Sequence, residues 1–73
     1  MNYPIHLNKI ETIKKDLWYS NDKKFANDCG VSYPTYLAIR SEKTSGMKFL
    51  NGLNKLLVRN KLEPQKITSF IKD

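Results

Sequence analysis

The chain has 73 residues, which is enough for one small domain with a thin core and excludes a second domain. Its single cysteine excludes an intrachain disulfide, and one cysteine with one histidine falls short of a four-ligand zinc site. The net charge is +6, from 13 Lys and Arg against seven Asp and Glu, and this excess favours polyanionic partners, nucleic acid first.

No group of residues indicates catalysis. The histidine, His6, is close to the N-terminus, and no convincing Ser–His–acid set can be built around it. The three glycines are scattered and form no phosphate-binding loop, while Cys29 occupies an apolar position that suits a core. We therefore expect no enzymatic activity, no cofactor, no bound metal and no small-molecule substrate.

The N-terminal stretch MNYPIHLNKIETIKKD contains no apolar run of signal-peptide length. No segment approaches the ~20 apolar residues that span a bilayer. A single cysteine also suits a reducing compartment. These features predict a soluble cytoplasmic protein with no membrane partner.

Residues 1–73 are expected to form a single domain, in which residues 1–7 are an extended N-terminal arm because Pro4 lacks a backbone donor. Asn8 and Glu11 have the spacing of a capping box and predict the start of a helix. Apolar residues then recur on one helical face, at Leu7, Ile10, Ile13 and Leu17.

This first helix is expected to cover residues 8–19, with Trp18 and Tyr19 closing it and packing across the core. Asn21 is the favoured N-cap of a second helix over residues 22–29. The inner face of the second helix is expected to be Phe25, Ala26 and Cys29. A third helix is expected over residues 33–41, with Ser32 as its cap and Pro34 in its first turn.

Ser45 is expected to cap a fourth helix. The apolar stripe of that helix is Leu50, Leu53, Leu56 and Leu57, supported by Met47 and Phe49. Gly52 inside it costs about 1 kcal/mol relative to alanine, and close packing is a reason to keep it. Pro64 is expected to open a fifth helix with Ile67, Phe70 and Ile71 on its apolar face. No strand pattern competes, so the predicted fold class is all-α, with five short helices.

The stretch from Asp22 to Ser41, DKKFANDCGVSYPTYLAIRS, has the pattern of two short helices that meet at a sharp angle. Ala26 is small enough to let the second helix come close, and Gly30 can adopt the left-handed conformation that ends the first. With these features the stretch resembles the helix-turn-helix of the Cro/repressor (Xre-like) family of DNA-binding proteins, in particular its small phage- or plasmid-type members. The alternative is an ordinary helical hairpin in which the glycine is only a cap.

The resemblance implies that the helix starting near Tyr33 enters the major groove of an operator. The residues at family positions that face bases are Ser32, Tyr33, Thr35, Leu37 and Ser41. The residues expected to contact DNA phosphates are Lys23, Lys24, Arg40, Lys43 and Lys48. The sequence departs from the common family pattern because it lacks the Gln and Asn pairs that read adenine bidentately.

Each of these assignments has a structural alternative. Tyr33 can cover Phe25 or a neighbour, and Leu37 can belong to the core or to a protein interface. Arg40 and Lys43 can form a solvated face.

We expect a sequence-specific, Cro-like repressor that binds double-stranded DNA, with a possible homodimer on paired half-sites. The residues expected at the dimer interface, or alternatively used only to close the core, are Leu62, Ile67, Phe70 and Ile71. The rival function is a small phage-type inhibitor that uses the same fold to bind a host protein. It is motivated by the apolar and aromatic start of the third helix, since exposed aromatic residues are common interface anchors.

Overall fold

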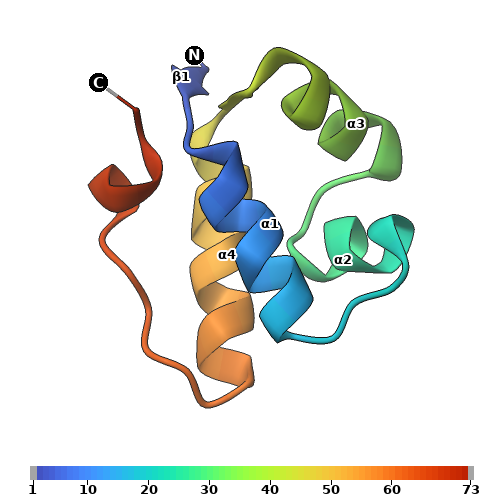
Figure 1. The fold of residues 1–73 in the computed structure, drawn as a ribbon, viewed down its shortest axis with the longest axis vertical. Coiled ribbons are helices and arrows are strands. Elements are labelled where there is room, and N and C mark those ends of the chain that lie inside the picture. The colour runs from blue at the N-terminus through green and yellow to red at the C-terminus, as the bar shows by residue number, and fades with distance from the viewer. Residues whose placement is uncertain (1, 73) are drawn as a thin grey trace.

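The computed structural model describes residues 2–72 and shows a mostly helical domain (Figure 1). In this part of the chain the elements are β1 (Tyr3–Pro4), α1 (Leu7–Asp16), α2 (Asp22–Asp28), α3 (Tyr33–Glu42), β2 (Thr44–Ser45), α4 (Met47–Arg59) and one 3₁₀ turn (Ile67–Phe70). The prediction of five helices and no strands is therefore right only in part. The helical class is confirmed, but the described residues form four α-helices and a short antiparallel strand pair.

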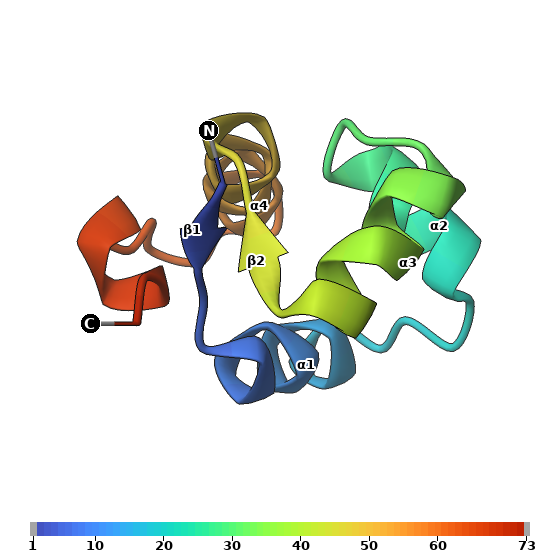
Figure 2. The same ribbon diagram turned by 90° about the horizontal axis from the view of Figure 1, so that it is seen from above.

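The described part of the N-terminal segment is not a free arm, which corrects the prediction for residues 1–7. Tyr3 and Pro4 pair with β2 in antiparallel register, and Figure 2 shows the two strands side by side. The Ile5 N–H donates to the carbonyl of Lys43 (3.0 Å), and Ile5 is buried. The His6 N–H donates to the carbonyl of Phe70 (2.9 Å), so this segment joins β2 to the C-terminal part of the chain.

Helix α1 begins and ends earlier than predicted. His6, and not Asn8, is its N-cap, and no side chain caps this end, so the expected capping box does not form. Ile10 and Ile13 are buried, as the apolar spacing predicts.

The C-terminal end of α1 is a Schellman motif. The N–H groups of Trp18 and Tyr19 donate to the carbonyls of Lys15 (3.0 Å) and Lys14 (3.2 Å), respectively. This motif puts Trp18 in the left-handed region, with φ 65°, and leaves it 92% exposed. The prediction that Trp18 packs across the core is wrong, because the turn points its side chain outward. Tyr19 does pack, edge-on against the Phe25 ring with centroids 5.2 Å apart.

Helices α2 and α3 have the predicted caps. The Asn21 side chain accepts from the N–H groups of Lys23 (2.8 Å) and Lys24 (3.2 Å), and Ser32 caps α3 with Pro34 in the first turn. Gly30 has φ 84°, as predicted for the end of α2. The turn is again a Schellman motif, in which the Val31 N–H donates to the carbonyl of Ala26 (3.0 Å).

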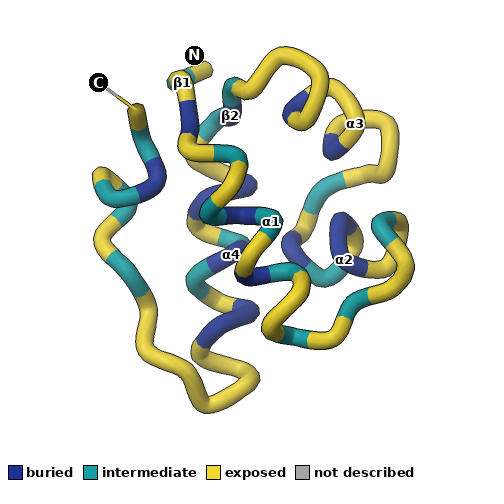
Figure 3. Tube along the Cα trace, in the orientation of Figure 1, coloured by how far each residue is buried: buried dark blue, intermediate teal, exposed yellow. Residues whose placement is uncertain are grey.

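The core is built around three aromatic rings from different helices. Phe25 of α2 meets Tyr36 of α3 edge-on at 5.5 Å, and Tyr36 lies 6.1 Å from Phe49 of α4. Ala26 and Cys29 are also fully buried, as predicted for the inner face of α2. Buried residues of all four helices contribute to this core, and Figure 3 marks the buried positions along the chain in dark blue.

Helix α4 keeps its predicted apolar stripe, which is buried at Phe49, Leu50, Leu53, Leu56 and Leu57. Met47 is exposed, in contrast to the prediction, and Gly46 replaces Ser45 as the N-cap. Ser45 is instead buried in β2. The α-carbon of Gly52 faces the backbone of Cys29, which confirms close packing as the reason for this glycine.

The C-terminal segment is not a fifth α-helix. It runs back along α4, and its one helical element among the described residues is the 3₁₀ turn (Figure 1). The Asn54 side chain holds this segment by bonding both the N–H (2.9 Å) and the carbonyl (2.7 Å) of Gln65. Phe70 is completely buried, so it cannot lie in a dimer interface while the domain is folded. Ile67 and Ile71 pack at the edge of the core, and only Leu62 is largely exposed.

Candidate nucleic-acid interface

The outer side of α3 is the surface that the sequence assigned to base reading. Tyr36 and Ile39 are buried, so the opposite side of the helix is the one that faces solvent. The exposed residues nearest the middle of that side are Pro34, Leu37, Ala38 and Ser41. Among the five predicted base readers, Leu37 and Ser41 are therefore the most central.

Tyr33 and Thr35 lie on opposite flanks of α3, about 160° apart around its axis at 3.6 residues per turn. Tyr33 is 36% exposed and Leu37 is 40% exposed, so neither is a core residue. Ser32 and Thr35 use their hydroxyl groups locally. Ser32 Oγ accepts from the Thr35 N–H (3.3 Å) and lies 2.8 Å from Thr35 Oγ1, so part of the hydrogen-bonding capacity of both groups caps the helix.

A pocket of about 240 Å³ opens between α3 and the start of α4. Thr35, Ala38 and Glu42 line it from α3, and Lys48 lines it from α4. Ala38 was not among the residues predicted to face bases, although its position one turn after Pro34 puts it on the exposed side. Its small side chain leaves room for a ligand to approach the α3 backbone.

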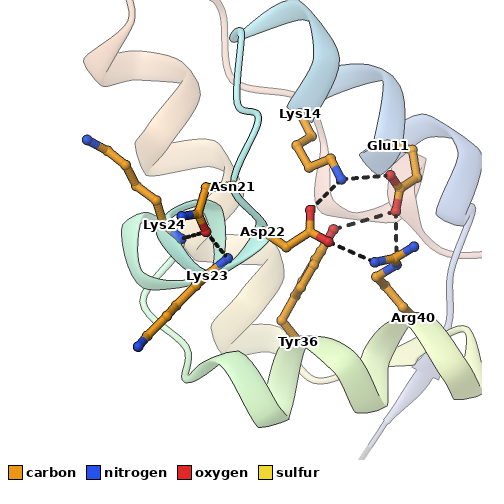
Figure 4. Close-up of polar contacts among 8 residues, drawn as sticks. All are labelled: Glu11, Lys14, Asn21, Asp22, Lys23, Lys24, Tyr36 and Arg40. Atoms are coloured by element: carbon orange, nitrogen blue, oxygen red, sulfur yellow. Dashed lines mark hydrogen bonds and ion pairs between the residues drawn. The ribbon is translucent and has the colours of Figure 1, made fainter.

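Four charged side chains connect α1, α2 and α3 (Figure 4). Arg40 Nη1 lies 2.9 Å from Asp22 Oδ2, and Arg40 Nε lies 3.5 Å from Glu11 Oε1. Lys14 Nζ lies 2.6 Å from Asp22 Oδ1 and 3.3 Å from Glu11 Oε2. The two cations and two carboxylates balance, so Arg40, which was predicted to contact phosphate, has its charge neutralised within the domain.

The contacts within this cluster, made of Glu11, Lys14, Asp22 and Arg40, shift the pKa values of Lys14 and of the adjacent Tyr36. Burial lowers the pKa of Lys14, but hydrogen bonds to Asp22 and Glu11 raise it, and the net pKa is above its ordinary value. Burial and the Glu11 charge raise the pKa of Tyr36 to about 12, and the Tyr36 hydroxyl donates to Glu11 Oε1 at 3.5 Å. The cluster thus fixes α3 against α1 and the start of α2.

The predicted phosphate contacts at the start of α2 are arranged differently. Lys23 and Lys24 extend from the first turn of α2 and point away from the cluster, as Figure 4 shows. Both are exposed, and neither forms an ion pair with a described residue. The first-turn N–H groups of these two lysines are already taken by the Asn21 cap, so their side chains are the groups left to bind an anion.

Lys43 and Lys48 flank the connection between α3 and α4. Lys43 ends α3 in the left-handed region, with φ 57°, and its side chain is exposed. Lys48 is exposed in the first turn of α4. Of the predicted phosphate contacts, Lys23, Lys24, Lys43 and Lys48 are in no ion pair with a described residue, while Arg40 is paired with Asp22 and Glu11.

Cys29 is unsuited to nucleophilic chemistry. It is buried in the core, and burial with the nearby Asp28 charge raises its thiol pKa to about 12. Between residues 2 and 72, no three His, Cys, Asp or Glu side chains gather in a group that could hold a metal ion. Over the same residues, no helix has the length and apolar character needed to cross a membrane.

No protein-family model matches the chain, and neither a curated protein nor a solved structure is similar enough to it to count as a match. Membership of the Cro/repressor family therefore stays a prediction from the residues between Asp22 and Ser41.

Proposed function

We propose that the protein is a sequence-specific DNA-binding regulator that places α3 in the major groove of an operator. The observation that carries this proposal is the α2–turn–α3 unit. It has a left-handed Gly30, a capped α3 start at Ser32 and an α3 whose outer side is solvent-exposed. A major groove about 12 Å wide admits one α-helix, and the side chains on the outer side then face base edges.

In this proposal Leu37 and Ser41 lie deepest in the groove. Leu37 offers only apolar contact, for which a thymine methyl is the natural target, and Ser41 offers a hydroxyl that can donate or accept. Tyr33 and Thr35 contact the bases to either side. The small side chain of Ala38, which the prediction from sequence omitted, allows close approach between them.

Phosphate contacts are assigned to Lys23 and Lys24 on one side and to Lys43 and Lys48 on the other. Such contacts supply affinity and salt dependence, while the α3 side chains supply sequence choice. Arg40 is left out of this set because its charge is balanced by Asp22 and Glu11. Occupancy of the operator by the bound protein would exclude polymerase or a competing regulator, in the cytoplasm where the DNA lies.

A homodimer on two half-sites about one helical turn apart extends the same proposal. Leu62 is an exposed apolar residue just after α4, with Ile67 and Ile71 half-exposed at the edge of the core. Phe70 has no part in this interface because the core uses it.

The experiment is a selection of duplexes from a random pool at two salt concentrations, followed by titration of the enriched sequence. The L37A/S41A variant should lose the preference for the enriched sequence over random duplex by at least tenfold, since each lost base contact costs about 1–3 kcal/mol. V58A, which changes an exposed apolar residue on α4, should keep that preference. Failure of the pool to enrich any motif with the wild-type protein would overturn the proposal.

A second candidate function is a protein-binding inhibitor. Several large apolar side chains are exposed, at Trp18, Tyr33, Leu37 and Met47, and exposed aromatic residues are typical interface anchors. This function predicts a stoichiometric protein partner that co-purifies after nuclease treatment and is lost in a Tyr33→Ala variant. Absence of any such partner would exclude it.

A further inference from the structure

The free cations of the domain do not gather only around α3. A groove of about 400 Å³ runs between α4 and the C-terminal end of α2, next to the Gly30 turn. We call it the α4 groove; its lining residues are Asn27, Asp28, Cys29, Gly30, Lys48, Asn51, Gly52, Lys55 and Arg59. No role was assigned to Lys55 or Arg59 in the DNA-binding surface described above.

Three cations form a stripe on the wall of this groove. Lys48, Lys55 and Arg59 are separated by seven and four residues, so they lie on one side of α4 and cover about 16 Å of its length. All three are exposed, and none is in an ion pair with a residue that the structure describes. One acid, Asp28, lines the groove, and its carboxylate accepts a hydrogen bond from the Tyr19 hydroxyl (2.5 Å).

The chemistry of the lining favours nucleic acid over a protein partner. None of the large exposed apolar residues of the domain lines the groove, so a protein would find no aromatic or aliphatic anchor there. The groove instead offers cations and the side-chain amides of Asn27 and Asn51. Cations, amides and closely approached backbone are the groups that bind phosphodiester oxygens.

The groove is also placed next to the proposed reading helix. Gly30 lies in its wall and belongs to the turn that leads into α3, while Lys48 lines both this groove and the pocket beside Thr35. A duplex strand presents a phosphate every ~3.4 Å along its axis, so 16 Å of α4 faces several of them. We infer that the α4 groove is a second phosphate-binding track, which holds the DNA backbone through Lys55 and Arg59. This inference rests on the proposed DNA-binding function.

The test compares two variants that lose the same charge. K55Q/R59Q removes the two new groove cations, and K15Q/K66Q removes two exposed lysines that do not line the groove. Dissociation constants for the enriched duplex and for a random duplex are measured over a range of salt concentrations, with circular dichroism as a check that both variants fold. A third variant, K55R/R59K, keeps both charges.

For K55Q/R59Q we expect the slope of log affinity against log salt to fall by about 1.8, since each neutralised phosphate contributes about 0.9. Its affinity at low salt should drop at least tenfold, while K15Q/K66Q and K55R/R59K should keep the wild-type slope. Equal slopes for K55Q/R59Q and K15Q/K66Q would overturn the second track.

The α3 variant L37A/S41A separates this inference from the proposed function. Loss of sequence preference in L37A/S41A, with no change of salt slope in K55Q/R59Q, would support the DNA-binding regulator and overturn the second phosphate-binding track. If the wild-type protein enriches no motif from the pool but K55Q/R59Q still reduces the salt slope on random duplex, the phosphate-binding track is supported and the sequence-specific regulator is overturned. A wild-type protein that binds no duplex would reject both.

Discussion

The α-carbon of Gly52 in α4 lies against the carbonyl group of Cys29, so that a methyl group at position 52 would be 1.8 Å from the carbonyl oxygen. The obstacle is backbone at the C-cap of α2, which cannot move as a flexible side chain can. Glycine at this position therefore sets the distance between α4 and the end of α2, and with it the position of the Gly30 turn that leads into α3.

Replacing Gly52 with alanine should destabilise the domain. Alanine is the better helix former by about 1 kcal/mol, but forcing a methyl group into this contact costs typically 1–3 kcal/mol and here moves backbone. We expect a lower urea midpoint for Gly52→Ala, measured by circular dichroism. Asn51→Ala is the matched control on the exposed side of the same helix, where the methyl meets no such contact, and its midpoint should not fall. A Gly52→Ala midpoint equal to or above that of the control would show that α4 can shift away from α2.

Trp18→Gly should stabilise the domain. Trp18 has φ 65°, and a left-handed backbone conformation costs a residue with a Cβ about 1–2 kcal/mol. Glycine avoids this cost, but it loses more conformational entropy on folding, which offsets part of the gain. We expect a net gain of about 0.5–1 kcal/mol in the free energy of unfolding. The side chain is exposed, so little packing is lost. Trp18→Ala keeps the strained backbone and should be no more stable than the wild type; a glycine variant no more stable than the alanine variant would contradict the strain.

Arg40→Ala should affect folding more than DNA binding. Its ion pairs with Asp22 and Glu11 are partly exposed, and pairs of this kind contribute about 0.2–1 kcal/mol. We expect a loss of that size in stability and an unchanged salt slope for DNA affinity. Lys43→Ala is the comparison, since a phosphate contact there should lower the slope by about 0.9. A slope reduced by the same amount in Arg40→Ala would mean that DNA displaces Asp22 from the arginine.

Stability should fall as the pH rises from about 9 to 12. Burial raises the pKa of the Cys29 thiol from 9.0 to about 12, and burial raises the pKa of the Tyr36 and Tyr19 hydroxyls from 10.0 to about 12. The unfolded chain therefore loses these protons first, so the folded state holds more protons and is disfavoured by rising pH. The loss is up to about 1.4 kcal/mol per pH unit for each group in its window.

Urea midpoints at successive pH values measure this loss. Cys29→Ala should reduce the slope of the curve most between about pH 9 and 10, where the unfolded thiol titrates and the unfolded tyrosines are at most half ionised. A flat curve for the wild-type protein above pH 9 would contradict the burial of all three groups.

Features that depend on neighbouring residues were predictable from the sequence. The caps at Asn21 and Ser32 are hydrogen bonds that span at most three residues, and Gly30 ends α2 because a residue without a Cβ enters the left-handed region at low cost. The apolar faces of α1, α2 and α4 follow from helical spacing alone. The cap at Ser32 also sets where α3 begins, and so it places Tyr33 and Leu37 near the start of that helix.

The tertiary structure decided what depends on pairs far apart in the chain. The sequence predicted Ile5 in an extended arm, and only the folded chain brings its N–H to the carbonyl of Lys43. It left Phe70 between a dimer interface and the core, and the burial of Phe70 depends on the C-terminal segment folding back along α4. Arg40 was predicted to contact phosphate, and only the tertiary structure shows its ion pairs with Asp22 and Glu11, which lie 18 and 29 residues away in the chain. Short-range spacing carries no information on these pairings, because each forms only after the helices have packed. The sequence by itself therefore determined the two short helices α2 and α3 and the Gly30 turn between them, and packing decided which cations form ion pairs within the domain.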